Sequence, residues 1–299
     1  MSAIKNVTLV GGSGRLGSFI LDKLLASNIF NVQVLKRVDS PSTHAAGVKV
    51  VEADFTDLES LTTAFQGQDA VVSVVSDAGA LSQKLMIDAA IVAGVKRFLP
   101  SNFGSNLANP NTRRLPIFTM KVAVEDYLIE KSKITDLTYT FVNNGGFTDF
   151  CIENKIIMDF SNYTPKLFNG GGYQFSSTSM PTVGDAVVGV LKHPIETQNR
   201  PVYVSELVLS QNQLLSVARQ IAPSKPWAPV SVDLDALVKS AMERLARGQH
   251  DLPTVLPILL KSAMDPEFGA KFTENDNGLL GIQSKTEEYL IELITPLLN

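Results

Sequence analysis

The sequence predicts an α/β fold, a doubly wound parallel (Rossmann) sheet with a smaller C-terminal substrate lobe. A glycine-rich segment at 11–17 follows the short apolar run 7–10 and opens an amphipathic run at 16–25. Apolar runs of strand length alternate with helical periodicity through the first half. Beyond Asn144 this alternation loosens, and 299 residues suffice for a large domain with a smaller lobe. We expect residues 1–150 to form the first part and residues 151–299 the lobe, with some chain crossing back.

The elements of the first half follow from their periodicity and their end signals. Strands are expected at 4–10, 32–35, 48–52, 69–75, 97–99 and 137–142, and helices at 16–27, 57–65, 81–92 and 117–131. Thr56 or Asp57 is expected to cap the 57–65 helix. Because the strands are continuously apolar, both faces of the sheet should be covered. Ligands then bind at the carboxyl ends of the strands.

The second half is expected to close over those strand ends and complete a substrate pocket. Residues 169–172 predict a turn or small hairpin between 167–168 and 173–175. Helices are expected at 182–192, 211–221, 233–247, 254–264 and 285–294. Pro223, Pro226 and Pro229 break the chain between two of them.

Composition narrows the functional class. The 26 basic and 30 acidic residues give a net charge of −4 without a Lys/Arg cluster, so no nucleic acid partner is expected. No apolar run reaches about 18 residues and no leader is recognisable, so we expect a cytoplasmic protein that does not bind membranes. Cys151 is the sole cysteine, and His44, His193 and His250 lack ligand spacing, so no metal site is expected. A monomer or homodimer acting on a small molecule fits best.

The glycine-rich segment predicts a pyrophosphate site. It reads Gly11, Gly12, Ser13, Gly14, Arg15, Leu16 and Gly17. The first glycine permits the tight turn, the middle one lets the backbone approach phosphate, and the last allows close helix packing. Free N–H groups at the helix N-terminus then receive the anion.

The second strand favours NADPH over NADH. It ends Lys36-Arg37, with no acid before Asp39 to accept the ribose 2′-hydroxyl. Both cations could hold a 2′-phosphate, with Arg15 approaching from the other side, although they could also be solvated strand-end residues. Asp54 and Phe55 follow the third strand and are expected in the cofactor site. Asp54 is placed either to meet the adenine or to cap the next helix.

Several segments resemble the isoflavone reductase-like family, within the NmrA-like atypical short-chain dehydrogenases. They are GGSGRLG at 11–17, VKRFLPSNFG at 95–104, FTMK at 118–121 and SQNQL at 210–214. The resemblance runs from about residue 4 to about residue 220, and the KRFLPSNFG string is its most specific part. The family includes the phenylcoumaran benzylic ether and pinoresinol–lariciresinol reductases.

The resemblance implies an NADPH-dependent reductase in which Lys121, at the family's Phe-x-x-Lys position, is the general acid/base. Hydride would pass to a carbon of an aromatic metabolite. Two departures stand out. The family's Ser-Glu-Phe-Gly is Ser-Asn-Phe-Gly here, so Asn102 replaces a carboxylate near the active site. The segment 143–147 (NNGGF) is smaller than the usual Asn-Phe-Phe type, so the substrate should differ from plant lignans.

Fold geometry also favours Lys121, because it lies in the first turn of a helix whose N-terminus faces the ligand edge. Tyr127 and Lys131 have the spacing of the ordinary Tyr-x-x-x-Lys pair but lie at the far end of that helix. Expected cofactor contacts besides those above are Ser76, Ser101, Asn102, Phe103, Lys121 and Asn144. Expected substrate contacts are Phe103, Phe118, Gly145, Gly146, Phe147, Phe150 and Cys151.

Three functions follow from this site. The first is reduction of an electrophilic carbon in a small aromatic or polycyclic secondary metabolite. The second is an NADP(H)-binding regulatory sensor without catalysis, as among NmrA-like relatives. The third is a redox-neutral reaction that uses bound cofactor. A proton donor at position 121 favours an enzyme over a sensor.

Overall fold

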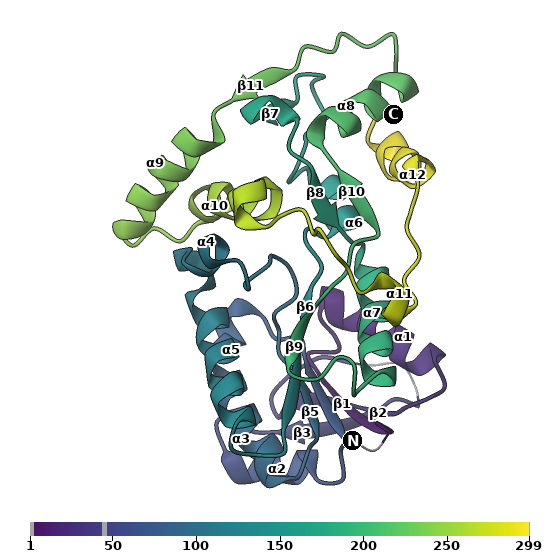
Figure 1. The fold of residues 1–299 in the computed structure, drawn as a ribbon, viewed down its shortest axis with the longest axis vertical. Coiled ribbons are helices and arrows are strands. Elements are labelled where there is room, and N and C mark those ends of the chain that lie inside the picture. The colour runs from purple at the N-terminus through teal and green to yellow at the C-terminus, as the bar shows by residue number, and fades with distance from the viewer. Residues whose placement is uncertain (1–2, 44–46, 299) are drawn as a thin grey trace.

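A seven-stranded, entirely parallel sheet forms the lower half of the molecule (Figure 1). The computed structural model describes residues 3–43 and 47–298. In spatial order the strands are β3 (Lys49–Ala53), β2 (Asn31–Arg37), β1 (Asn6–Val10), β4 (Ala70–Ser73), β5 (Arg97–Leu99), β6 (Thr138–Asn143) and β9 (Arg200–Tyr203). From β1 the chain first adds β2 and β3 on one side, and it then returns to add β4, β5, β6 and β9 on the other side of β1, so the order of strand addition reverses between β1 and β4. This reversal is the topological switch point at which doubly wound sheets bind ligands.

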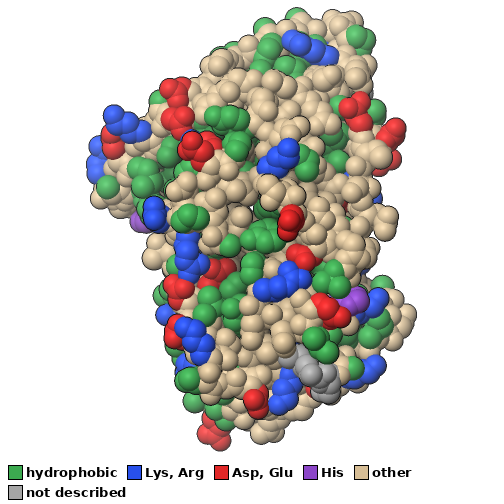
Figure 2. Space-filling view, in the orientation of Figure 1, with side chains coloured by type: hydrophobic (Ala, Val, Ile, Leu, Met, Phe, Trp, Pro, Cys, Tyr) green, Lys and Arg blue, Asp and Glu red, His purple; other side chains and the backbone are tan. Residues whose placement is uncertain are grey.

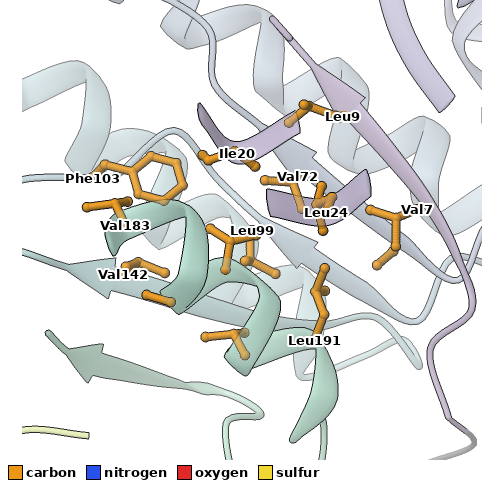
Figure 3. Close-up of a cluster of buried hydrophobic side chains, with 14 of the residues drawn as sticks. Val7, Leu9, Ile20, Leu24, Val72, Leu99, Phe103, Val142, Val183 and Leu191 are labelled. Carbon is orange, nitrogen blue, oxygen red and sulfur yellow. The ribbon is translucent and has the colours of Figure 1, made fainter. Parts of the chain in front are cut away.

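Helices cover both faces of this sheet, which confirms the predicted doubly wound fold. They are α1 (Arg15–Ala26) and α7 (Met180–Lys192) on one face, and α2 (Leu58–Phe65), α3 (Gln83–Val92) and α5 (Thr119–Ser132) on the other. Side chains of β1 alternate between the two faces of the sheet. Leu9 packs on the face covered by α1 and α7, and Val10 on the face covered by α2, α3 and α5. Figure 3 shows the first layer, in which Ile20, Val72 and Leu99 lie close together.

The upper half is a smaller lobe with a core of its own (Figure 1). It contains α6 (Thr148–Glu153), α8 (Gln211–Ile221), α9 (Leu234–Ala246), α10 (Leu252–Met264) and α12 (Glu287–Leu298), with β8 (Phe175–Ser177) paired to β10 (Leu207–Leu209) and β7 (Lys166–Phe168) to β11 (Val230–Val232). Short helices α4 (Pro110–Arg113) and α11 (Asn277–Leu280) join the lobe to the sheet half. Helices α9 and α10 project sideways above α4.

The chain crosses back from the lobe to the sheet. Helix α7 packs against α1, and β9 adds the seventh strand beside β6. Both elements lie beyond residue 150 and belong structurally to the first half. The strand β9 was not predicted, because its four residues begin Arg200-Pro201 and carry no alternating or continuous apolar pattern.

Two further predictions need correction. Residues 169–172 form a turn, as one of the two predicted forms, with Asn169–Gly171 in a short 3-10 segment; the hairpin alternative is wrong, because the flanking strands β7 and β8 belong to different two-stranded sheets. The 81–92 segment is shorter as an α-helix, since its first turn belongs to the 3-10 helix η1 (Asp77–Ser82). By contrast, Asp57 caps α2 as expected, with its carboxylate accepting bonds from the backbone N–H groups of Glu59 and Ser60.

Charges of both signs are interspersed over the face drawn in Figure 2. Within 3–43 and 47–298, no helix is both long enough and apolar enough to cross a bilayer.

Candidate active site

The glycine loop after β1 is too tightly packed to accept larger residues. A Cβ on Gly11 would lie 2.5 Å from the Val74 carbonyl oxygen, and Gly11 has a φ of +83°. A Cβ on Gly17 would lie 2.0 Å from the Gly11 carbonyl oxygen, so α1 can approach the turn only with glycine there. Gly14 ends the turn immediately before α1. The backbone therefore forms the cradle that a pyrophosphate requires.

A cleft of about 570 Å³ opens in front of this loop, at the carboxyl ends of β1, β2 and β4. The predicted cofactor residues that line it are Gly11, Gly12, Ser13, Gly14, Lys36, Arg37, Phe55 and Ser76. Sequence reasoning missed Ser40, Ser42, Thr56, Gly79 and Ser82, which also line it and lie in loops or at helix starts. The cleft lies at the switch point of the sheet, which is where the fold predicts a dinucleotide.

The two cations after β2 differ in their surroundings. Lys36 lies 3.0 Å from a carboxylate oxygen of Glu52 on β3 and donates a 3.2 Å bond to the Ser40 carbonyl oxygen. Arg37 is exposed and has no ion-pair partner among the described residues. Lys36 is thus largely neutralised by its neighbour, and Arg37 is the cation with charge to offer an anion.

Several predicted cofactor residues lie elsewhere. The Arg15 guanidinium does not line the cleft and instead lies 4.4 Å from the centroid of the Phe150 ring. Asp54 is exposed, and its carboxylate accepts bonds from the backbone and hydroxyl groups of Thr56, so its observed role is in the turn. Leu16 packs in the core and Gly17 against the loop backbone. Ser101 donates to the Val75 carbonyl oxygen.

A second cavity of about 280 Å³ lies between the sheet half and the lobe. All seven predicted substrate contacts line it: Phe103, Phe118, Gly145, Gly146, Phe147, Phe150 and Cys151. They follow β5 and β6 or begin α5 and α6. The cleft and this cavity therefore lie in succession along one edge of the sheet.

The lobe supplies walls that the sequence did not indicate. They come from α10 (Val255, Leu259, Leu260, Ala263 and Met264), from the segment after α6 (Ile156 and Ile157) and from β8 (Phe175 and Ser177); Ile117, Gly104 and Ser105 complete the lining. Apolar residues recur at helical spacing along α10. This spacing predicts that one face of the helix is buried, but it does not predict what that face packs against.

Lys121 is the charged side chain of this cavity. It lies in the first turn of α5, is half-buried, and its Nζ donates a 3.4 Å hydrogen bond to the Phe103 carbonyl oxygen. The Phe103 ring packs beside Ile20 and Val183 in the core (Figure 3). The carbonyl to which Lys121 donates therefore belongs to a residue whose ring lies in the core.

Polar groups close to the cavity are deeply buried. Asn144 is fully buried, and its Oδ1 atom has no hydrogen-bond partner in the described part of the chain. Gly145 adopts a φ of +65°, and a Cβ there would lie 2.1 Å from the Ser176 carbonyl oxygen. The Asn102 side chain, expected beside the cofactor, is instead bonded to Glu125 on α5. Burial raises the pKa of the Cys151 thiol to about 12, so this residue is a neutral part of the wall.

The alternative Tyr-x-x-x-Lys pair lies apart from both cavities. The Tyr127 hydroxyl and the Lys131 ammonium both contact the Asp88 carboxylate on α3. Within the described residues no group of His, Cys, Asp and Glu side chains could hold a metal ion; His44 lies outside them.

Comparisons with known proteins agree with this geometry. Residues 3–224 match the NmrA-like family. The chain is 34% identical to the oxidoreductase aprR of Aspergillus flavus over 81% of this chain and 82% of that protein. It is 29% identical to the oxidoreductase poxI of Penicillium oxalicum, covering 97% and 94% of the two chains.

Solved structures share the fold at low identity. An isoflavone reductase superposes with a TM-score of 0.79 at 20% identity, covering 97% of this chain and 99% of that one. AtPrR2 with NADP⁺ and (+)-pinoresinol gives 0.78 at 19% identity, covering 98% and 100%. The family match and the aprR identity together show that this chain belongs to the NmrA-like family.

Proposed function

We propose that this protein is an NADPH-dependent reductase of a small, uncharged, aromatic or polycyclic metabolite, with Lys121 as its general acid/base. One observation carries the proposal. The cation Lys121 lies in an apolar cavity at the same edge of the sheet as a cleft with the geometry of a dinucleotide site. The curated relatives aprR and poxI, both named oxidoreductases, support it.

The cleft fits NADPH by its own residues. The loop of Gly11, Gly12 and Gly14 offers backbone N–H groups to a pyrophosphate, and Arg37 offers charge to a 2′-phosphate. Bound NADPH would supply the hydride.

The cavity lining limits the substrate. Apart from Lys121, every lining residue is apolar or neutral, so a charged substituent would be buried without a second partner. The volume of about 280 Å³ is at the lower end of ligand pockets, which run from roughly 300 to 1,000 Å³. Five phenylalanines, Phe103, Phe118, Phe147, Phe150 and Phe175, line the cavity and would favour an aromatic molecule.

Lys121 would manage the proton at the reacting centre. Its Nζ is held by the Phe103 carbonyl oxygen at the cavity wall, from which it can donate a proton to a developing oxyanion or accept one from a hydroxyl. The apolar walls exclude water and strengthen this interaction. The same constellation would be unnecessary in a protein that only senses NADP(H).

Incubation with deuteride-labelled NADPH and a metabolite extract of the source tests the proposal. Wild-type protein should transfer deuterium to one product, detected by mass spectrometry. Lys121→Ala should lower the turnover by about 10²- to 10⁴-fold, as expected for a lost general acid, with NADPH affinity unchanged. Lys131→Ala, at the other end of α5, is the matched control and should retain turnover.

Each alternative gives a different result. Tight NADPH binding without label in any product would indicate the regulatory sensor. A product that forms only with protein present, but carries no deuterium, would indicate a redox-neutral reaction. A Lys121→Ala variant as fast as wild type would remove Lys121 from the mechanism while leaving reductase chemistry in place.

A further inference from the structure

Glu125 is a buried carboxylate in the face of α5 that packs against the sheet. It is 4% exposed, and its buried neighbours on the same helix are Val124 and Leu128. A carboxylate in such a position requires partners, because an isolated buried charge is strongly unfavourable.

Two polar side chains bind Glu125 from different segments. Its Oε1 accepts a hydrogen bond from Asn102 Nδ2, in the loop after β5. Its Oε2 accepts a 2.6 Å bond from Arg113 Nη1, in α4. Arg113 also contacts Asp126 on the exposed side. Glu125 thus ties the loop after β5 and the helix α4 to α5.

The two partners of Glu125 offset its burial only in part. Burial raises the pKa of Glu125 even though the bonds from Arg113 and Asn102 lower it. A carboxyl group with a raised pKa in the folded state favours folding when protonated, and this contribution is lost as the pH rises through that pKa. Removing the Glu125 carboxylate would leave Asn102, which is 2% exposed, without the acceptor of its side-chain hydrogen bond.

The position of Glu125 suggests what it does. Asn102 immediately precedes Phe103, whose carbonyl oxygen accepts the hydrogen bond from Lys121 Nζ. Lys121 and Glu125 are four residues apart on α5 and therefore lie on the same side of the helix. Lys121 is thus bonded to Phe103 and Glu125 to Asn102, so two hydrogen bonds join α5 to adjacent residues of one loop.

We propose that Glu125 is a positioning residue for Lys121: through Asn102 it fixes the Phe103 carbonyl and thereby the place of the Lys121 ammonium in the cavity. This inference rests on the proposed role of Lys121 in proton transfer. In this chain Asn102 stands where the resembled family has a carboxylate, and Glu125 supplies a carboxylate to the same loop from the helix.

Glu125→Met tests the proposal without relying on substrate. Competitive labelling with acetic anhydride, read by mass spectrometry, reports the accessibility of the Lys121 amine. We expect Lys121 to label about fivefold faster, the equivalent of one lost hydrogen bond, in a protein that still folds but melts at a lower temperature, because Asn102 and Arg113 lose their acceptor. The NADPH dissociation constant should remain that of the wild type, since the glycine loop is untouched.

Matched variants separate positioning from general disturbance of α5. Asn102→Ala should accelerate Lys121 labelling as Glu125→Met does, and the double variant should add little, because both remove one link. Glu125→Gln, which keeps an acceptor oxygen for Asn102, should restore slow labelling. Tyr127→Phe breaks a bond at the other end of α5 and should leave Lys121 labelling unchanged.

Turnover completes the test once the labelled product is known. Glu125→Met should lower kcat by about 10²-fold, the cost of a misplaced catalytic group, without changing KM for NADPH. Wild-type Lys121 labelling in a folded Glu125→Met or Asn102→Ala protein would overturn the proposal. If Lys121→Ala retains turnover while Glu125→Met still changes labelling, the proposed function fails but the positioning link stands.

Discussion

The cofactor cleft and the substrate cavity lie in succession along one sheet edge but are built in opposite ways. The cleft is lined by residues 11–82, and its centre is backbone that only glycine can supply. The cavity is lined by residues 103–264, drawn from both halves of the molecule, and consists of apolar side chains around Lys121. The proposed phosphate site is thus built from one local stretch of backbone, whereas the proposed substrate cavity depends on tertiary packing.

This difference bears on how the two sites tolerate change. A Cβ on Gly11 or Gly17 would overlap backbone atoms, which cannot move aside. The cavity wall also includes a partly exposed side chain, Leu259, whose change should alter the shape of the cavity more than the stability of the fold. Solved structures sharing this fold at 19–20% identity include an isoflavone reductase and AtPrR2 with (+)-pinoresinol.

Gly17→Ala should have the largest effect on the cleft. The added methyl group would lie 2.0 Å from the Gly11 carbonyl oxygen, so α1 must move away from the loop. We expect the NADPH dissociation constant to rise by about 10²-fold, which corresponds to ~3 kcal/mol, within the range of overpacking costs. Titration of NADPH fluorescence measures this change.

Gly278→Ala is the matched control for that variant. Gly278 is exposed in α11, with no atom within 4 Å of an added Cβ. Alanine there should leave NADPH binding unchanged and preserve or slightly raise the melting temperature, since alanine favours a helix by about 0.5–1 kcal/mol. Equal NADPH affinity in both variants would show that the loop is not the phosphate cradle.

Arg37→Ala should have a smaller effect, confined to the 2′-phosphate. We expect NADPH to bind about tenfold more weakly and NADH to bind as before, because one charge-assisted contact of about 1.5–3 kcal/mol is lost. Lys36→Ala should change the NADPH/NADH ratio less, since Lys36 is already paired with Glu52. Calorimetry with both cofactors gives the ratio. A larger loss in Lys36→Ala would reverse the assignment.

The contrast between the two sites also explains what could be predicted from sequence. The parallel sheet, the glycine loop and the cap at Asp57 follow from local pattern, and the structure confirms them. The contact between Arg15 and Phe150 and the bond from Asn102 to Glu125 join residues far apart in the chain, and no local signal indicates them. The strand β9 was missed for the same reason, because only its neighbour β6 makes it a strand.

The smallest expected effect comes from changing a side chain of α10 that lines the cavity. Leu259→Ala removes part of a wall that is 37% exposed, so stability should change little. Loss of about one methylene contact with a bound substrate should raise KM for the labelled substrate by about fourfold, with the NADPH dissociation constant unchanged. Leu252→Ala, on the same helix but 70% exposed and outside the cavity, should leave both constants unchanged. Equal effects of the two substitutions on KM would mean that α10 does not contact the substrate, and the cavity would then have to be assigned without the lobe.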